Sequence, residues 1–195
     1  MRILIFVITL LLLSTSALAV HEIPLDVSAL DISTERGSHN SVIATAQDSQ
    51  GYIWMASIRG IYVYDGRVAR RVLEDVLRET KIRDLRIDGD DVLWVGTNSG
   101  VLAYSLENGT PRWYRTNDTP AGLSTRSVNI IYADQKGALW AGTVNGGLHR
   151  YEPSFDRFDM VDITPPHPDT QWSVFDIAES PKRDMWLPRG RECSA

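Results

Sequence analysis

The residues of this chain that could do chemistry are few and widely spaced. The four histidines are His21, His39, His149 and His167. None lies in an H-x-x-x-H or H-x-H arrangement, so the sequence does not support a zinc site. The stretch "DGDD", Asp88 to Asp91, begins like a calcium-binding loop, but the distant glutamate that completes such a loop is absent, and a hairpin turn is the better interpretation. Cys193 is the only cysteine and has no base near it in sequence, which excludes an internal disulfide framework and disfavours a nucleophilic thiol.

Motifs for covalent catalysis and nucleotide binding are also missing from the sequence. It contains no G-x-S-x-G, G-x-x-x-x-G-K-[ST] or C-x-x-C motif. "GTNSG" and "GTVNGG" are rich in glycine, but neither leads into a helix whose N-terminus could hold phosphate. We therefore predict no catalytic residues, no metal site and no cofactor, and we interpret His149 as a surface or packing residue.

A repeat centred on tryptophan organises the chain instead. "DSQGYIWMASIRG" (48–60), "DGDDVLWVGTNSG" (88–100) and "DQKGALWAGTVNGG" (134–147) align on Trp54, Trp94 and Trp140, at intervals of 40 and 46 residues. Four more positions agree in all copies: an aspartate six residues before the tryptophan, a small residue and a hydroxyl two and three residues after it, and a glycine six residues after it. In that order they are Asp48, Asp88 and Asp134; Ala56, Gly96 and Gly142; Ser57, Thr97 and Thr143; and Gly60, Gly100 and Gly146.

Each copy is predicted to form four short β-strands, because apolar and β-branched residues come in short runs separated by turn residues. In the third copy the expected strands are 127–134, 138–143, 147–153 and 155–163. The D-x-x-G between the first two predicts a hairpin turn, in which Asp134 accepts hydrogen bonds from backbone amides and Gly137 adopts a positive φ. Asp91 replaces that glycine in the second copy and is expected to adopt the same conformation, since aspartate reaches the left-handed region more readily than most residues.

A period of about 40 to 50 residues with four strands is typical of a β-propeller blade. The tryptophans are expected to pack on the neighbouring blade, and the small residue two positions later to let backbones approach closely. The predicted fold class is all-β: three four-stranded blades around Trp54, Trp94 and Trp140 and part of a fourth around Trp186, in an incomplete ring preceded by a signal peptide.

The repeats resemble those of a known family. The stretch 122–158, "GLSTRSVNIIYADQKGALWAGTVNGGLHRYEPSFDRF", is similar to the repeat of the two-component regulator propeller family, as are 39–66 and, more loosely, 82–104. The resemblance implies a propeller that usually has seven blades per ring, often with two rings in series. It also implies an extracytoplasmic receptor segment that precedes an immunoglobulin-like domain, a transmembrane helix and a histidine kinase or diguanylate cyclase.

The fourth copy begins regularly and then departs from the pattern. A first strand is expected from Trp172 to Ala178, but Pro188, Arg189 and Glu192 replace the small residue, the hydroxyl and the glycine after Trp186. We interpret the chain as the front part of a longer receptor, cut short within its fourth blade. The alternative is a fragment that closes its ring by assembling with other chains, and open propeller edges predict self-association.

The N-terminus has the pattern of a secretory signal peptide over residues 1–19: a basic start at Arg2, an apolar run from Ile3 to Leu13 and "SALA" before the cleavage site. The predicted organisation continues with a lead-in strand at 20–38, propeller repeats at 39–187 and an anomalous tail at 188–195. Localisation is predicted to be periplasmic or secreted, with no membrane span after cleavage. The formal net charge of −5 disfavours a nucleic-acid partner, and we interpret the basic run 67–71, which acidic residues follow, as a solvated surface.

Loops between second and third strands, and between blades, line one face of a propeller. The corresponding positions are Ile58 and Arg59, Asn98 and Ser99, and Val144 and Asn145, with Arg36 and Arg126 on the segments that start blades. Arg59, Asn98, Ser99, Asn145 and Arg126 are the candidate ligand residues, and their chemistry suits a small polar ligand such as a glycan or carboxylate. Ordinary turn residues are the alternative interpretation.

The leading functional hypothesis is an extracytoplasmic ligand-sensing propeller segment of a bacterial two-component or cyclic-di-GMP signalling receptor. Such a segment contributes recognition but carries no output domain. The alternatives are a secreted propeller enzyme of the lactonase or lyase kind, and a protein-binding scaffold.

Overall fold

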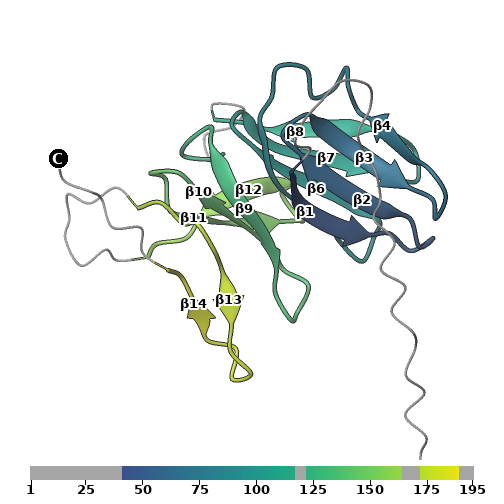
Figure 1. Ribbon diagram of the computed structural model, residues 1–195. Helices are drawn as coiled ribbons and strands as arrows, with labels where there is room; N and C mark the ends of the chain where they lie inside the picture. Colours follow the sequence, from purple (N-terminus) through teal and green to yellow (C-terminus); the bar gives the residue numbers. More distant parts are fainter. Residues whose placement is uncertain (1–40, 117–121, 164–171, 189–195) are drawn as a thin grey trace, which may run out of the picture. The chain divides into compact units, whose positions relative to one another are not determined.

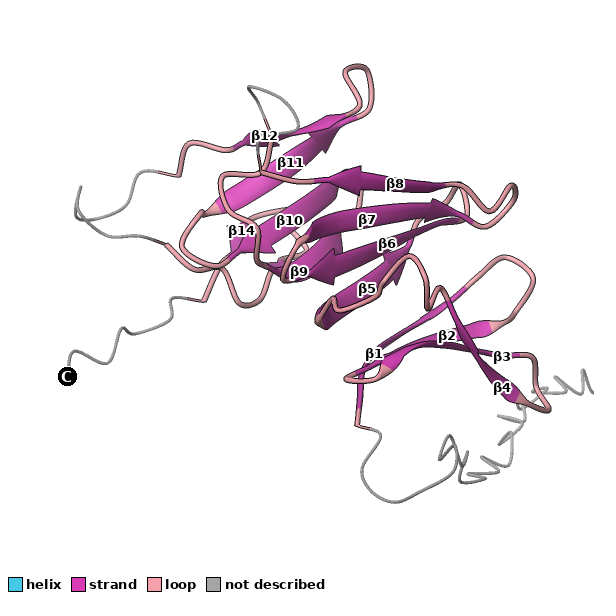
Figure 2. Cartoon of the chain, turned by 90° about the horizontal axis from the view of Figure 1, so that it is seen from above, coloured by secondary structure: helices cyan, strands magenta, loops and turns pink. Residues whose placement is uncertain are grey.

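The computed structural model describes residues 41–116, 122–163 and 172–188, and every helix-or-strand element among them is a strand (Figure 2). The strands form three four-stranded antiparallel sheets and one two-stranded sheet, each built from consecutive strands (Figure 1). The first blade comprises β1 (Val42–Gln47), β2 (Ile53–Ser57), β3 (Gly60–Tyr64) and β4 (Ala69–Val72). The second blade comprises β5 (Ile82–Ile87), β6 (Val92–Thr97), β7 (Gly100–Ser105) and β8 (Pro111–Tyr114). The third blade comprises β9 (Val128–Ala133), β10 (Leu139–Thr143), β11 (Leu148–Glu152) and β12 (Arg157–Met160), and β13 (Ala178–Glu179) and β14 (Met185–Trp186) form the fourth-blade hairpin.

These elements confirm the all-β fold class and the blade-like sheets. The four strands expected in the third copy all form, although each is shorter than its apolar run because the outermost residues belong to the turns. Within the described residues the sheets do not close into a ring, as expected. The signal peptide at 1–19, the lead-in strand at 20–38 and all but Pro188 of the tail at 188–195 lie outside the described residues.

The spacing of aspartate and tryptophan that recurs in the three copies has a direct physical cause. In each blade one carboxylate oxygen of the aspartate accepts the backbone N–H groups two and four residues later, and this folds the first hairpin turn. The other oxygen accepts the indole N–H six residues later, at 2.8 Å for Asp48 and Trp54, 2.7 Å for Asp88 and Trp94, and 3.0 Å for Asp134 and Trp140. One side chain therefore fixes both the turn and the orientation of the tryptophan.

The position that closes this turn has a positive φ in every copy. Gly51 and Gly137 have φ values of 90° and 80°. Asp91 has a φ of 52°, which confirms that aspartate takes the place of glycine in the second blade.

The tryptophans of the three complete blades are covered by the blade that follows. Trp54 is 9% exposed and packs in a cluster with residues of the second blade, among them Ile82 and Leu85. Trp94 is 4% exposed and meets Tyr151 and Phe158 of the third blade, with ring centroids 4.9 and 6.1 Å away. Trp140 packs against Val174 and Ile177, which lie just before the fourth-blade hairpin. Each blade thus depends on its successor for part of its core.

The small residue after each tryptophan allows this close approach. A Cβ added at Gly142 would lie 2.7 Å from both Ile130 and Val174, and one at Gly96 would lie 3.3 Å from Val128. Buried polar groups fix the same junctions: Asp84 of β5 accepts the backbone N–H of Ile131 at 2.9 Å. Burial raises the pKa of Asp84, although the hydrogen bonds from Ile131 and Leu85 and the nearby Arg86 act in the opposite direction.

The fourth copy differs from the sequence-based prediction. The strand expected at 172–178 is reduced to an isolated bridge at Val174 and to β13, and β14 ends at Trp186. Ser180 stands where the other copies have aspartate, and its hydroxyl accepts the N–H groups of Lys182 and Asp184, so the turn forms. Trp186 is 66% exposed, whereas Trp54 and Trp94 are 9% and 4% exposed.

Candidate functional site

The turns between second and third strands are built by a buried hydroxyl. Ser57, Thr97 and Thr143 are fully buried, and each donates to the carbonyl of the glycine that starts or directly precedes the next strand, at 3.2, 2.8 and 2.9 Å. In the first two blades the hydroxyl also accepts the N–H of the second turn residue. Each sheet therefore presents its turn residues at the end opposite the aspartate turn.

The third of these turns is one residue longer than the other two. Gly60 and Gly100 accept from the hydroxyl and have φ values of 142° and 121°. In the third blade Gly147, with a φ of 73°, takes this place, and not Gly146, which the spacing from Trp140 singled out. Gly146 has a different constraint, because an added Cβ would lie 2.3 Å from the hydroxyl of Ser124.

The segment that precedes the first strand of the second and of the third blade is hydrogen-bonded to the turn between the second and third strands of the same blade. Asn98 and Lys81 exchange two hydrogen bonds, from Asn98 N to Lys81 O at 3.1 Å and from Lys81 N to Asn98 Oδ1 at 2.8 Å. The third turn is held in the same way, with Val144 N donating to Ser127 O at 2.8 Å. We call the set formed by turns 58–60, 98–100 and 144–147 and by segments 73–81, 122–127 and 172–173 the turn face.

The five candidate ligand residues all lie on the turn face, but they divide into two groups. The amide oxygen of Asn98 is occupied by Lys81, and that of Asn145 accepts the hydroxyl of Ser173 at 2.8 Å, so both asparagines hold blade starts in place. Ser99 donates its backbone N–H to Thr97. Arg59 and Arg126 have exposed side chains. Arg36 lies outside the described residues.

A cavity of about 400 Å³ lies beside Arg59 on the turn face. Its lining comprises Ile58, Arg59, Gly60, Arg71, Val72, Leu73, Glu74, Asp75, Leu77, Arg78, Glu79, Thr80 and Ile82. Segment 73–80 forms its wall: Leu77 is buried against the first two blades, while Glu74, Asp75, Arg78 and Glu79 remain exposed.

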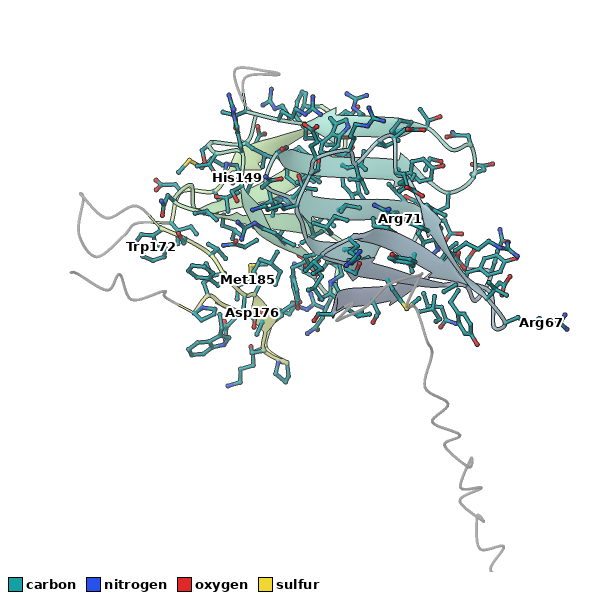
Figure 3. All side chains as sticks on the ribbon, turned by 45° about the horizontal axis from the view of Figure 1, so that its top comes forward. Arg67, Arg71, His149, Trp172, Asp176 and Met185 are labelled. Carbon is teal, nitrogen blue, oxygen red and sulfur yellow. The ribbon has the colours of Figure 1, made fainter. Side chains whose placement is uncertain are left out.

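Arg71 connects the cavity wall to the first turn (Figure 3). Its Nη2 donates to the carbonyl of Arg59 at 2.5 Å, and its Nη1 lies 3.2 Å from Glu74 Oε2. A Cβ at Gly60 would lie 2.8 Å from Arg71 Nε, so glycine makes room for the guanidinium. The basic run 67–71 was interpreted as a solvated surface, which fits the exposed Arg67 and Arg70 but misses the part of Arg71 in the cavity.

His149 anchors the start of the third blade from within the core (labelled in Figure 3). Its side chain is fully buried, and Nε2 accepts the backbone N–H of Ser124 at 3.1 Å. Burial lowers the pKa of His149 to about 4, so the imidazole is neutral at neutral pH and Nδ1 carries its proton. Because Ser124 also donates to Gly146 O at 2.8 Å, His149 positions part of the turn face without being exposed on it.

Within residues 41–116, 122–163 and 172–188, no three His, Cys, Asp or Glu side chains gather in a way that could hold a metal ion. In that same part of the chain, no helix is long and apolar enough to span a membrane.

Residues 36–59 match the family model of the two-component regulator propeller. The matched stretch covers the first aspartate turn, Trp54 and the first turn-face residues, and it confirms the family resemblance seen in the repeat. No curated protein sequence matches the chain.

Several solved structures share the fold at low sequence identity. One is the extracellular domain assigned to a hybrid two-component system from B. thetaiotaomicron, with a TM-score of 0.65 and 21% identity over 78% of this chain and 22% of that one. Virginiamycin B lyase from Staphylococcus aureus has a TM-score of 0.57 and 14% identity over 77% and 49% of the two chains. PorZ, a surface component of the type-IX secretion system of Porphyromonas gingivalis, has a TM-score of 0.58 and 18% identity over 82% and 24%. The chain thus spans about a fifth to a half of the length of these neighbours, and the likeness establishes the propeller fold.

Proposed function

We propose that this chain is an extracytoplasmic ligand-sensing propeller segment of a bacterial two-component or cyclic-di-GMP signalling receptor. The observation that carries the proposal is the match of residues 36–59 to the two-component regulator propeller. The extracellular domain from B. thetaiotaomicron, which shares the fold, supports a location outside the cytoplasm. In this proposal the chain recognises a ligand and does not catalyse a reaction.

The ligand is a small polar molecule such as a glycan or carboxylate, bound in the cavity beside Arg59. Arg59 and Arg78 bring two exposed guanidinium groups to its lining, and guanidinium groups pair with carboxylates in a bidentate manner. Glu79 and Thr80 add acceptors for sugar hydroxyls. A volume of about 400 Å³ lies in the range of small-molecule sites.

Titration calorimetry with uronic-acid disaccharides and their neutral counterparts tests this proposal. We expect a uronic-acid disaccharide to bind, and Arg59→Gln and Arg78→Gln each to weaken its binding about tenfold, as loss of a charge-assisted hydrogen bond does. Arg67→Gln is the matched control, because Arg67 projects away from the sheets (Figure 3) and does not line the cavity. Binding that both cavity variants leave unchanged would refute this site. Chelator-sensitive turnover of a lactone or glycan would support the lyase alternative instead.

A further inference from the structure

A second cavity lies between the second and third blades, at the end of the sheets where the aspartate turns are. Its volume is about 820 Å³. The lining comes from the two aspartate turns and from strands β6, β10 and β11: Asp88, Gly89, Asp90, Val92, Trp94, Asp134, Lys136, Gly137, Ala138, Leu139, Trp140, Arg150, Tyr151 and Pro153. We call this cavity the inter-blade groove. It is separate from the turn face, which lies at the opposite end of each second strand.

Two glycines border the groove at positions where side chains take part in bridges at the neighbouring junctions. Between the first and second blades, Ser49 donates its backbone N–H at 3.0 Å and its hydroxyl to the carboxylate of Asp91. Between the third blade and the fourth-blade hairpin, Gln135 donates its backbone N–H to Glu179 at 2.8 Å. At the junction between them, Gly89 occupies the position of Ser49 and Gln135.

The carboxylate that accepts in the first of these bridges is missing as well, since Gly137 occupies the position of Asp91. A Cβ added at Gly89 or at Gly137 would meet no atom within 4 Å. At the aspartate-turn end both sides of this junction therefore border open space, whereas carboxylate side chains tie the aspartate turns at the junctions before and after it. Elsewhere along the sheets the second and third blades are joined by side chains, as by the hydrogen bond from Ile131 N–H to Asp84.

Two opposite charges border the groove. Asp90 and Lys136 occupy the same position of the repeat, two residues after the turn aspartate, on the two facing turns. Both side chains are exposed, and among the residues that the structure describes neither takes part in an ion pair. They are available to a ligand that carries a positive and a negative group.

The remaining lining combines aromatic and apolar surface with charge. Trp140 and Tyr151 are only partly buried, and the guanidinium of Arg150 lies 5.7 Å from the centroid of the Trp140 ring. Burial raises the pKa of Asp134, but hydrogen bonds from Trp140 and from the turn amides outweigh this effect and hold the pKa below its ordinary value. With Asp88 and Asp90 this makes three carboxylates against Lys136 and Arg150, a lining that repels a phosphate or another simple anion.

We propose that the inter-blade groove binds a short peptide with free ends. Its ammonium group pairs with Asp90, its carboxylate pairs with Lys136, and its side chains lie on Trp140 and Tyr151. A neutral sugar would leave both charges without a partner, whereas a zwitterion with an apolar body matches the charges and the surface between them. A volume of about 820 Å³ suits two or three residues. The proposal does not depend on the ligand proposed for the turn face.

Calorimetry with the tripeptide Ala-Phe-Ala, its N-acetyl form and its C-terminal amide tests the proposal on the full chain. We expect the free tripeptide to bind, and each blocked form to bind about tenfold more weakly, since each loses one charge-assisted contact. Asp90→Asn should weaken the free tripeptide but cause no further loss for the N-acetyl form. Lys136→Gln should likewise weaken binding of the free tripeptide but cause no further loss for the C-terminal amide. Equal binding of the free and blocked peptides would overturn the proposal.

A variant that closes the groove gives an independent test. Gly89→Ser with Gly137→Asp recreates the bridge between Ser49 and Asp91, and aspartate tolerates the positive φ of 80° at Gly137 as Asp91 does at 52°. We expect this double variant to melt at or above the wild-type temperature and to lose tripeptide binding. Gln50→Ala, at the repeat position of Asp90 and Lys136 but beside a bridged junction, is the control and should bind as wild type does. Absence of binding to wild type at millimolar tripeptide, or full binding to the folded double variant, overturns the proposal.

Discussion

Acidification tests how far the buried imidazole of His149 stabilises the folded chain. The side chain is fully buried, and Nε2 accepts the backbone N–H of Ser124, so protonation would both bury a charge and remove the acceptor. This is why burial lowers the pKa of His149 to about 4 from the ordinary 6.5. In the unfolded chain the same imidazole is exposed to water and regains the ordinary pKa.

The magnitude and sign follow from this difference in pKa. The imidazole of the folded state stays neutral while that of the unfolded state takes up a proton, so the unfolded state is stabilised relative to the folded state as the pH falls from about 6.5 to about 4. A difference of about 2.5 in pKa, at about 1.4 kcal/mol for each pKa unit, amounts to about 3.5 kcal/mol, of which about 3 kcal/mol is lost by pH 4. The stabilisation is fully present above the unfolded pKa and is lost through this window on acidification.

Urea unfolding at a series of pH values, followed by tryptophan fluorescence, measures the effect. His149→Gln is the matched variant, because its amide oxygen can still accept from Ser124 but does not titrate. We expect wild type to lose about 3 kcal/mol more than the variant between about pH 7 and about pH 4, while carboxylates contribute equally to both. Stability curves that run parallel through this window would refute the assignment.

Two further predictions concern the junctions and the incomplete fourth copy. Gly142→Ala should lower the free energy of unfolding by about 1 to 3 kcal/mol, because the new methyl group would lie 2.7 Å from Ile130 and Val174. Chemical denaturation measures this change. An unchanged free energy of unfolding would show that β10 can move away from its neighbours. Ser180→Asp should raise the free energy of unfolding by about 1 kcal/mol, since it restores the carboxylate that accepts the indole N–H in the other copies. It should also shift the fluorescence emission of Trp186 to shorter wavelength. Unchanged emission would contradict this prediction.

Local hydrogen bonding explains why so much of the fold was predictable. The aspartate turn joins residues only two to six positions apart, so Asp48 and Trp54 leave a mark that the sequence shows directly. The turn between the second and third strands, where a buried hydroxyl donates to a glycine carbonyl three or four residues later, can be recognised in the sequence equally well. In the fourth copy the same logic could have identified Ser180, which keeps the spacing to Trp186 and replaces a carboxylate with a hydroxyl that accepts the turn amides.

The features that the sequence did not reveal depend on contacts between distant segments. Asn98 and Asn145 were chosen for their polarity, yet the hydrogen bonds with Lys81 and Ser173 decide their roles. The choice of Gly146 failed because a turn one residue longer shifts the equivalent position to Gly147, which fixed spacing cannot detect. The cavity beside Arg59 depends on segment 73–80, whose sequence carries no repeat signal.

The coverage of each tryptophan by the following blade means that no blade is an independent folding unit. Stability resides largely at the interfaces between consecutive blades, as in a one-dimensional lattice with nearest-neighbour coupling. The third blade relies on residues 172–188 to shield Trp140. Trp54, Trp94 and Trp140, each tied to its own aspartate, are also intrinsic optical probes of one interface each, so replacing them singly would resolve the order in which the interfaces separate.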